Sequence, residues 1–296
     1  MKHSPRVTIS ALPGYALLEI FKFCVDQIFH EDAWHTLVHV CRKWRYVVFS
    51  SPRWLHLELR CTNKSPVKKL LDIWPALPIV IDASITNSRR SRVANIIAAL
   101  KRHDLVCKIS ILGVPDSLLK SATMKKRFPE LTDLTLVSNE DNAPIIPDSF
   151  LGGSAPRLRS LDFSGIPFPF PALGKLLLSA TDLVACDLWH IPKSGIISPE
   201  LIVTTLSTLT RLRKLSIGFR SPRSRADRER RHPSLLKRLV LPSLTYLYFK
   251  GDSEYLEDIV GRIDAPAFDS VTITFFNQLV FDTPLLRDFF SRTEVF

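Results

Sequence analysis

The stretch Leu131-Thr132-Asp133-Leu134-Thr135-Leu136 carries a pattern that recurs along most of the chain. Its three apolar positions follow the order L-x-x-L-x-L, in which x is any residue. The pattern also starts, with successive spacings of 25, 27, 25, 29, 32 and 24 residues, at six other positions: Val106, Leu158, Leu183, Leu212, Leu244 and Phe268. A period of this length indicates one supersecondary unit that is used repeatedly.

Units of about 20–29 residues with this pattern are typical of leucine-rich repeats. We therefore expect an α/β fold in which residues 61–296 form an irregular leucine-rich-repeat solenoid. Parallel strands would line its concave face, with helices or loops outside. Two further strands are expected near Leu57–Leu59 and Ile79–Ile81, and helices over Leu173–Ser179 and Tyr255–Arg262.

The repeats are irregular at the turn that follows each strand. Only the Leu131 unit has asparagine at that position, Asn139, so apolar stacking must do more to hold the units together. An α/β domain of another wound type is the alternative, although no Gly-rich phosphate loop follows a strand. The last eight residues show little sign of a polar cap, so either a terminal helix closes the last unit or the sequence is a fragment.

Side chains alternate along a strand, so the residues between the leucines should face the concave side. Acidic positions fall on the early strands, aromatic ones on the middle and late strands, and lysines late. Such a graded face could bind a peptide; the alternative is a solvated sheet face without a binding role. The residues that we expect to contact a target are Asp162, Asp187, Trp189, Lys214, Tyr246, Tyr248 and Lys250.

The longest unit contains a basic loop over residues 220–234, with six arginines in twelve residues. Arg223, Arg225 and Arg228 could bind a phosphorylated target, because guanidinium groups hold phosphate bidentately. The same loop could serve as a nuclear targeting patch, contact nucleic acid, or be merely solvated. No aromatic residue interleaves the arginines, which disfavours single-stranded nucleic acid.

Composition narrows the function classes. The net charge of +11 favours acidic partners, and no apolar run approaches the length of about eighteen residues that a membrane span needs. Five widely spaced cysteines without a C-x-x-C motif indicate buried, reduced thiols in the cytoplasm or nucleus. His35 and His39 are four residues apart but lack a third ligand. We expect no metal, no cofactor and no catalytic activity.

The first 60 residues have a different pattern, with two helical stretches and more apolar surface than a unit this short can bury. The first helix begins near Leu12-Pro13. The second is expected from about Asp32 to Phe49, where five apolar residues share one face: Leu37, Val40, Cys41, Trp44 and Val48. The remaining apolar surface indicates a partner; an ordinary helical cap on the following domain is the alternative.

The ordered set of motifs in residues 1–60 resembles an F-box. The motifs are Leu12-Pro13, Leu17-Leu18-x-Ile20-Phe21, Val40-Cys41-Arg42-x-Trp44-Arg45 and Pro52-x-Trp54. Residues 37–45 and the stretch Phe275-Phe276-Asn277-Gln278 are similar to the expanded F-box families of mushroom-forming fungi. Two departures are Gly14-Tyr15, where the family has an acidic pair, and a longer segment over residues 24–31.

The resemblance implies a substrate-recruiting adapter of an SCF-type ubiquitin ligase. The module would bind a Skp-type linker subunit, and through it a cullin, while the repeats hold a protein target. By resemblance, the docking or module-core residues are Leu12, Pro13, Leu17, Leu18, Ile20, Phe21, Val40, Cys41 and Trp44. The competing hypotheses are an interaction scaffold that degrades nothing and, on charge alone, a protein that binds nucleic acid.

Overall fold

The computed structural model describes residues 9–27, 33–52, 54–62, 64, 67–85, 90–138, 144–167, 170–222, 238–276 and 282–293. The chain divides into two compact units. Unit 1 comprises residues 1–60 and 68–79, and unit 2 comprises residues 61–67 and 80–296. Unit 1 first ends at residue 60, as expected from the sequence. Residues 68–79 return to unit 1 before the chain continues in unit 2.

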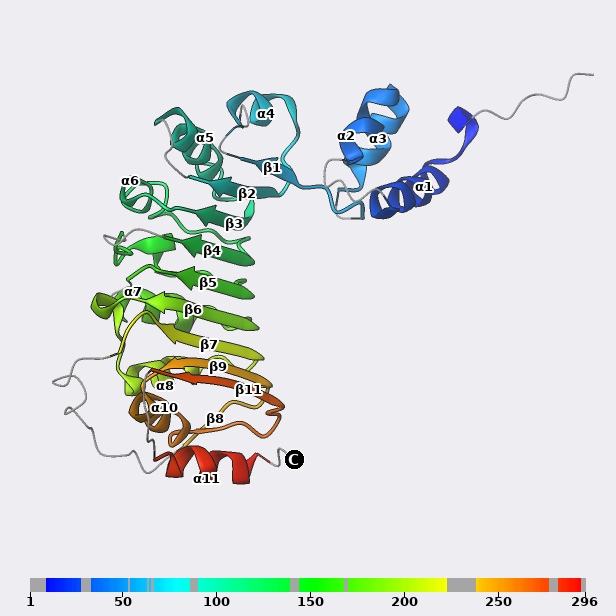
Figure 1. The fold of residues 1–296 in the computed structure, drawn as a ribbon. Coiled ribbons are helices and arrows are strands. Elements are labelled where there is room, and N and C mark those ends of the chain that lie inside the picture. Colours follow the sequence, from blue (N-terminus) through cyan, green and yellow to red (C-terminus); the bar gives the residue numbers. More distant parts are fainter. Residues whose placement is uncertain are drawn as a thin grey trace, which may run out of the picture. The chain divides into compact units, whose positions relative to one another are not determined.

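Unit 1 is helical. A short 3-10 turn, Ile9–Ala11, precedes α1 (Gly14–Gln27), α2 (Ala33–Val40) and α3 (Arg42–Ser50), and most of α4 (Val67–Ile73) belongs to the same unit (Figure 1). Its core consists of large apolar side chains that are almost fully buried: Leu17, Phe21, Trp34, Val38 and Val48. The Trp34 ring packs edge-on against Trp74, with ring centroids 5.3 Å apart, so the segment after α4 completes this core.

The single helix expected over residues 32–49 is wrong, because α2 and α3 are separate helices. Cys41 between them is extended, with φ −160° and ψ 170°. The break leaves carbonyl groups at the end of α2 without helical partners, and Arg45 Nε donates to the Val38 carbonyl oxygen at 3.0 Å. The expected common face is lost as well: Leu37 and Val48 are buried, whereas Val40 and Cys41 are exposed.

The strands form a nine-stranded parallel sheet in the order β1-β2-β3-β4-β5-β6-β7-β9-β11 (Figure 1). Both strands expected ahead of the repeats are confirmed, as β1 and β2. The bounds are β1 Leu59–Cys61, β2 Ile79–Ser84, β3 Val106–Leu112, β4 Asp133–Val137, β5 Ser160–Ser164, β6 Ala185–Ile191, β7 Lys214–Phe219, β9 Tyr246–Gly251 and β11 Ser270–Phe275. A separate parallel pair joins β8 (Leu239–Val240) to β10 (Ile263–Asp264).

The L-x-x-L-x-L pattern sets the register of this sheet. From β4 onward, the second and third apolar positions of each unit pair with their counterparts on the next strand and form two continuous rows. One row contains Leu134, Leu161, Cys186, Leu215, Leu247 and Val271, and the other contains Leu136, Phe163, Leu188, Ile217, Phe249 and Ile273. All are buried except the last member of each row, which is half-buried on the edge strand.

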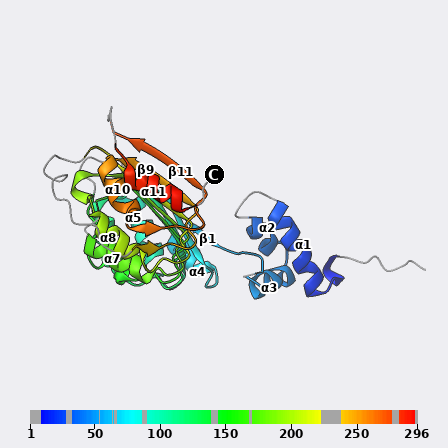
Figure 2. The same cartoon turned by 90° about the horizontal axis from the view of Figure 1, so that it is seen from below.

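Helices cover the face that carries these rows. Seen along the stack, α7, α8 and α10 lie together on one side of the strands (Figure 2). The helices of unit 2 are α5 Arg90–Leu100, α6 Asp116–Leu119, α7 Phe170–Ser179, α8 Pro199–Leu206, α10 Ser253–Val260 and α11 Pro284–Arg292, with 3-10 turns at Phe150–Gly153 and Lys193–Gly195. The helices expected over Leu173–Ser179 and Tyr255–Arg262 are confirmed as α7 and α10.

The turns after the strands are packed tightly. Gly165 has φ +69°, and a Cβ there would lie 2.1 Å from the Ser138 carbonyl oxygen of the preceding unit. Ile166 and Ile191, which occupy the turn position of their units, are buried. These contacts agree with stacking through apolar side chains; Asn139 lies outside the described residues.

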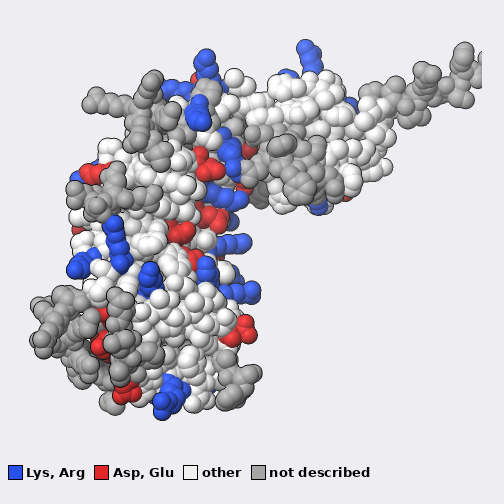
Figure 3. All heavy atoms as spheres, in the orientation of Figure 1, with Lys and Arg blue, Asp and Glu red and all other residues white. Residues whose placement is uncertain are grey.

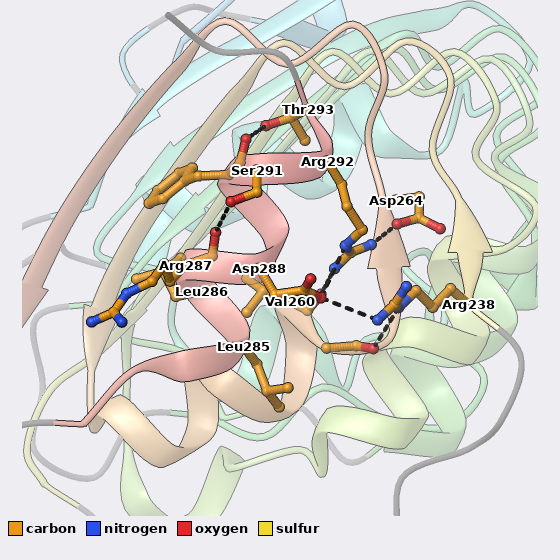
Figure 4. A network of polar contacts seen from close by, with 12 residues as sticks. Arg238, Val260, Asp264, Leu285, Leu286, Arg287, Asp288, Ser291, Arg292 and Thr293 are labelled. Carbon is orange, nitrogen blue, oxygen red and sulfur yellow. Dashed lines mark hydrogen bonds and ion pairs between the residues drawn. The ribbon is translucent and has the colours of Figure 1, made fainter.

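The helix α11 packs on the last unit through both of its ends. Two backbone N–H groups in its first turn, those of Leu285 and Leu286, donate to the buried Glu257 carboxylate at 2.8 Å each. Near the other end, Arg292 contacts Asp264 and donates to Asp288, which also accepts from Arg238 at 3.1 Å (Figure 4). The terminal helix that the sequence left as one alternative is therefore present.

Candidate functional site

The nine docking residues inferred from the resemblance fall into three groups in unit 1. Leu17 and Phe21 are fully buried, and the Phe21 ring packs against Trp44 with centroids 4.7 Å apart. Leu12, Leu18 and Trp44 are half-buried. The exposed members are Pro13, Ile20, Val40 and Cys41.

Unit 1 also exposes large side chains that are not among these nine docking residues. Tyr15, Phe23, Tyr46 and Trp54 are 74%, 67%, 75% and 48% exposed. Tyr15 and Phe23 lie two turns apart on α1, so they share a face of that helix. The excess of apolar residues around the helix was visible in the sequence, but which of them point outward depends on the packing of α2 and α3. We call the exposed large apolar side chains of unit 1 the apolar surface: Ile9, Tyr15, Ile20, Phe23, Val40, Tyr46, Trp54 and Ile73.

Basic side chains brace this surface. Lys43 Nζ on α3 donates to the Leu12 carbonyl oxygen at 2.8 Å and so joins α3 to the start of α1. Lys22 Nζ lies 4.4 Å from the centroid of the Trp54 ring, within the range of a cation–π interaction. With Arg45 on Val38, these contacts give three basic residues of unit 1 a structural role that the sequence did not predict.

A second candidate surface is the side of the sheet that α7, α8 and α10 do not cover (Figure 2). We call it the open face. It consists of the residues that alternate with the buried rows: Asp133, Thr135, Val137, Ser160, Asp162, Ser164, Ala185, Asp187, Trp189, Lys214, Ser216, Gly218, Tyr246, Tyr248 and Lys250. The alternation predicted from the sequence thus places all seven expected open-face residues on one side of the sheet.

Two carboxylates and one lysine meet in the middle of the open face. Asp162 on β5 pairs in register with Asp187 on β6. Lys214 Nζ on β7 lies 2.9 and 3.0 Å from the two oxygens of Asp187, which is almost buried. Burial raises the pKa of Asp162, the negative charge of Asp187 raises it further, and Lys214 partly offsets both. Asp162 makes no hydrogen bond or close ion pair within the described part of the chain.

An aromatic pair adjoins these carboxylates. The ring of Trp189 on β6 contacts Tyr248 on β9, with centroids 4.3 Å apart and planes at 53°. Gly218 on the intervening β7 makes the contact possible, because a Cβ there would lie 2.9 Å from Trp189 Cε3. Beside the pair, the Ser216 hydroxyl is fully buried and has no hydrogen-bond partner among the described residues.

The two other expected residues of this face lie farther along it. Tyr246 Oη is 3.4 Å from the Thr272 hydroxyl, and Lys250 Nζ is 6.0 Å from the Phe276 ring centroid, toward β11. Charged side chains also gather along one side of the strand stack (Figure 3). The turns before the strands contribute the pairs Glu130–Arg157 and Asp182–Arg211. Arg223, Arg225 and Arg228 of the basic loop lie outside the described residues.

The five cysteines are free. Burial raises the pKa of Cys61 to about 11 and that of Cys186 to about 12, so these thiols stay protonated at neutral pH. The expectation of buried thiols is wrong for Cys41, which is exposed at the break between α2 and α3. Among the described residues, no three or more His, Cys, Asp or Glu side chains gather as metal ligands would, and no helix has the length and apolarity to cross a membrane.

Comparison with known proteins adds no identification. No protein-family model matches the chain, and a search of curated proteins finds no match. The candidate sites therefore rest on the sequence motifs and on the geometry of the two units.

Proposed function

We propose that this protein is an F-box-type adapter of an SCF ubiquitin ligase. Unit 1 docks on a Skp-type linker subunit, which joins it to a cullin, and unit 2, a leucine-rich-repeat solenoid, holds a protein target. The observation that carries the proposal is the apolar surface of unit 1. Of fourteen large hydrophobic side chains that are exposed among the described residues, eight belong to this smaller unit.

Such a concentration supports a docking role, because large contiguous apolar patches are uncommon on monomeric soluble proteins. Aromatic residues supply much of the binding energy at protein interfaces, and the apolar surface has four of them, Tyr15, Phe23, Tyr46 and Trp54. The buried Leu17 and Phe21 support it differently, by fixing the helix from which Tyr15 and Phe23 project. Within the F-box-like motifs, Leu17 and Phe21 thus belong to the core, Arg45 stabilises the end of α2, and Val40 belongs to the exposed surface.

The repeats support the second half of the proposal. In-register rows leave the residues between the leucines on one face, and that face carries both charges and an aromatic pair. A rigid parallel sheet would present these groups at fixed spacing. Tethering a target in this way beside a ubiquitin-charged enzyme raises its effective concentration.

The test is copurification with a Skp-type linker, using a matched pair of substitutions. Val40 in unit 1 and Val240 in unit 2 are 56% and 55% exposed. Val40→Asp should weaken linker binding roughly 10- to 100-fold, because burying a valine contributes about 1.5–3 kcal/mol and each 1.4 kcal/mol is tenfold in affinity. Val240→Asp should leave it unchanged.

Three outcomes would count against the proposal. The wild-type chain could ignore the linker, Val40→Asp could bind normally, or both variants could lose binding equally. A protein that binds the linker but never promotes ubiquitin transfer to a bound target would instead be the interaction scaffold. Circular dichroism of both variants checks that neither substitution unfolds its unit.

A further inference from the structure

We propose that the open face recognises a positively charged side chain, lysine or arginine, of an extended target segment, and that Asp162 and Trp189 hold it. This inference rests on the proposed function only for the role of the bound segment as a target for recruitment. The chemistry of the site stands on the geometry of β5, β6, β7 and β9.

The first argument is charge. The row across the strands places Asp162 beside Asp187, and one lysine, Lys214, serves both. Its ammonium group contacts both oxygens of Asp187, so the Asp162 carboxylate has a charge without a close counterion within the described residues. Neighbouring acids do have partners: Asp182 contacts Arg211, and Asp133 accepts from the Thr132 hydroxyl at 2.7 Å.

The second argument is the aromatic pair. Trp189 lies two residues beyond Asp187 on the same strand and face, which makes it a diagonal neighbour of Asp162. Diagonal neighbours in a sheet are roughly 7–8 Å apart, within reach of one long side chain between them. The Trp189 ring leans over β7 toward Tyr248, so a segment that places its lysine or arginine on Asp162 and continues across β6 meets this ring next, and the ring attracts cations electrostatically.

The third argument is the polar floor of this patch. Ser216 lies between Asp187 and Tyr248 in the same row, its side chain is fully buried, and its hydroxyl has no partner in the described chain. A buried hydroxyl without a partner costs stability, so this row keeps a polar floor next to the Asp187–Lys214 pair that adjoins Asp162.

The charges also exclude the opposite ligand at this place. A phosphate or an acidic side chain above β5 and β6 would meet two carboxylates and a lysine that is already paired. Lys250, which makes no ion pair with the described residues, has its ammonium group 6.0 Å from the Phe276 ring centroid, toward β11. A bound segment should therefore place its basic residue over β5 and keep it away from β9.

A random dodecapeptide library displayed on phage, selected on the purified full-length chain, tests this directly. Peptides that bind the wild-type protein should be enriched in lysine or arginine over the unselected library. With a net charge of +11 the protein as a whole repels basic peptides, so general electrostatics would produce the opposite bias. Enrichment of acidic or uncharged peptides, or the absence of any binder, would overturn the proposal.

Matched variants locate the binding. For the strongest basic peptide, Asp162→Asn should raise Kd about tenfold or more, since a tenfold loss corresponds to 1.4 kcal/mol. Asp133→Asn, on the adjacent strand of the same face, should leave Kd unchanged. The same peptide with citrulline or norleucine in place of its basic residue should bind the wild type as weakly as the original binds Asp162→Asn. Equal affinity of the charged and neutral peptides would contradict the inference.

Two further measurements separate this proposal from that of the adapter. Peptide binding should change tryptophan fluorescence in the wild type but not in Trp189→Phe. Linker copurification of Asp162→Asn should equal that of the wild type. If the linker never binds but basic peptides do, the adapter role fails and the peptide site stands; if the linker binds but the library yields no basic peptide, only the peptide site fails.

Discussion

The two units use apolar residues in opposite ways. In unit 2 the leucines of successive strands form continuous rows that are buried beneath helices, and the other face of the sheet carries charged and aromatic side chains. In unit 1 a few side chains around Leu17 and Phe21 make a small core, and large residues such as Tyr46 and Trp54 remain exposed. A repeated unit can bury its surplus against its neighbour, whereas a short helical module needs another molecule to do so.

The largest expected effect tests the buried rows. Phe249 lies inside the second row, is fully buried, and touches Phe219 and Tyr255. Phe249→Ala should lower the free energy of unfolding by about 3–5 kcal/mol, because the cavity adds to the lost transfer energy. Urea denaturation of the wild type and of Phe249→Ala measures this difference in the free energy of unfolding.

The comparison between units supplies the control. Tyr46→Ala removes a side chain of similar size from unit 1, but one that is 75% exposed, and should change stability by about 0.5 kcal/mol or less. If Tyr46→Ala cost as much as Phe249→Ala, the apolar surface of unit 1 would be part of a core and the contrast drawn above would be wrong.

The next effect concerns the aromatic pair of the open face. In Gly218→Ala the new methyl group would collide with Trp189, so either the ring or the strand must shift. Overpacking of this kind costs roughly 1–3 kcal/mol. Thermal unfolding and near-ultraviolet circular dichroism should both change. An unaltered tryptophan signal would mean that Trp189 and Tyr248 do not pack over β7.

The sequence predicted more of unit 2 than of unit 1, and the reason is physical. A period of two residues within a strand, repeated every 24 to 32 residues, fixes which side chains are buried, and so the open face followed from the spacing of Leu134 and Leu136 and their counterparts. The ion pair of Asp187 with Lys214 does not follow from the register alone, because Asp187 lies opposite Ser216 and Lys214 lies opposite Ala185. The contact of Trp189 with Tyr248 does not follow from it either, because this contact crosses a strand and depends on the missing side chain of Gly218 and on an irregular register after Leu188.

Unit 1 was less predictable because helical periodicity continued across a break. Val40 and Cys41 occupy positions that a continuous helix would bury, and nothing in their residue types indicates that Cys41 is extended. At the break, Arg45 supplies a donor to the Val38 carbonyl group at the end of α2, and that contact lies outside the helical hydrogen-bond pattern. The motif set mixed core residues such as Leu17 with surface residues such as Val40.

A smaller change in stability is expected for a substitution in unit 1. Gly14 begins α1, and a Cβ there would meet only Val47 Cγ2, at an ordinary contact distance of 3.9 Å. Gly14→Ala should therefore stabilise unit 1 by up to about 1 kcal/mol, because alanine loses less backbone entropy in a helix. Amide hydrogen exchange of α1 measures the change locally. Gly218→Ala should instead lower the free energy of unfolding. If both substitutions changed stability in the same direction, the packing described for one of the two glycines would be wrong.

The smallest effect tests whether the charged Asp162 carboxylate lowers the stability of the folded protein. The pKa of Asp162 is raised in the folded state, so its carboxyl group holds a proton more tightly in the folded protein than in the unfolded chain. The stabilising contribution is complete below the unfolded pKa of about 4 and is lost as the pH rises through the folded pKa. Asp162→Asn should thus be more stable than the wild type at pH 7, by less than about 1 kcal/mol because the group is partly solvated.

At pH 3 that difference should vanish, because the wild-type carboxyl group is then neutral as well. Urea midpoints of the wild type and of Asp162→Asn at both pH values provide the measurement. A substitution that stabilises the fold while it weakens binding of a basic peptide is what a binding residue predicts, since its charge is useful only when a ligand neutralises it. A residue that served the sheet alone would lose stability when changed, and that result at Asp162 would return the open face to a structural role.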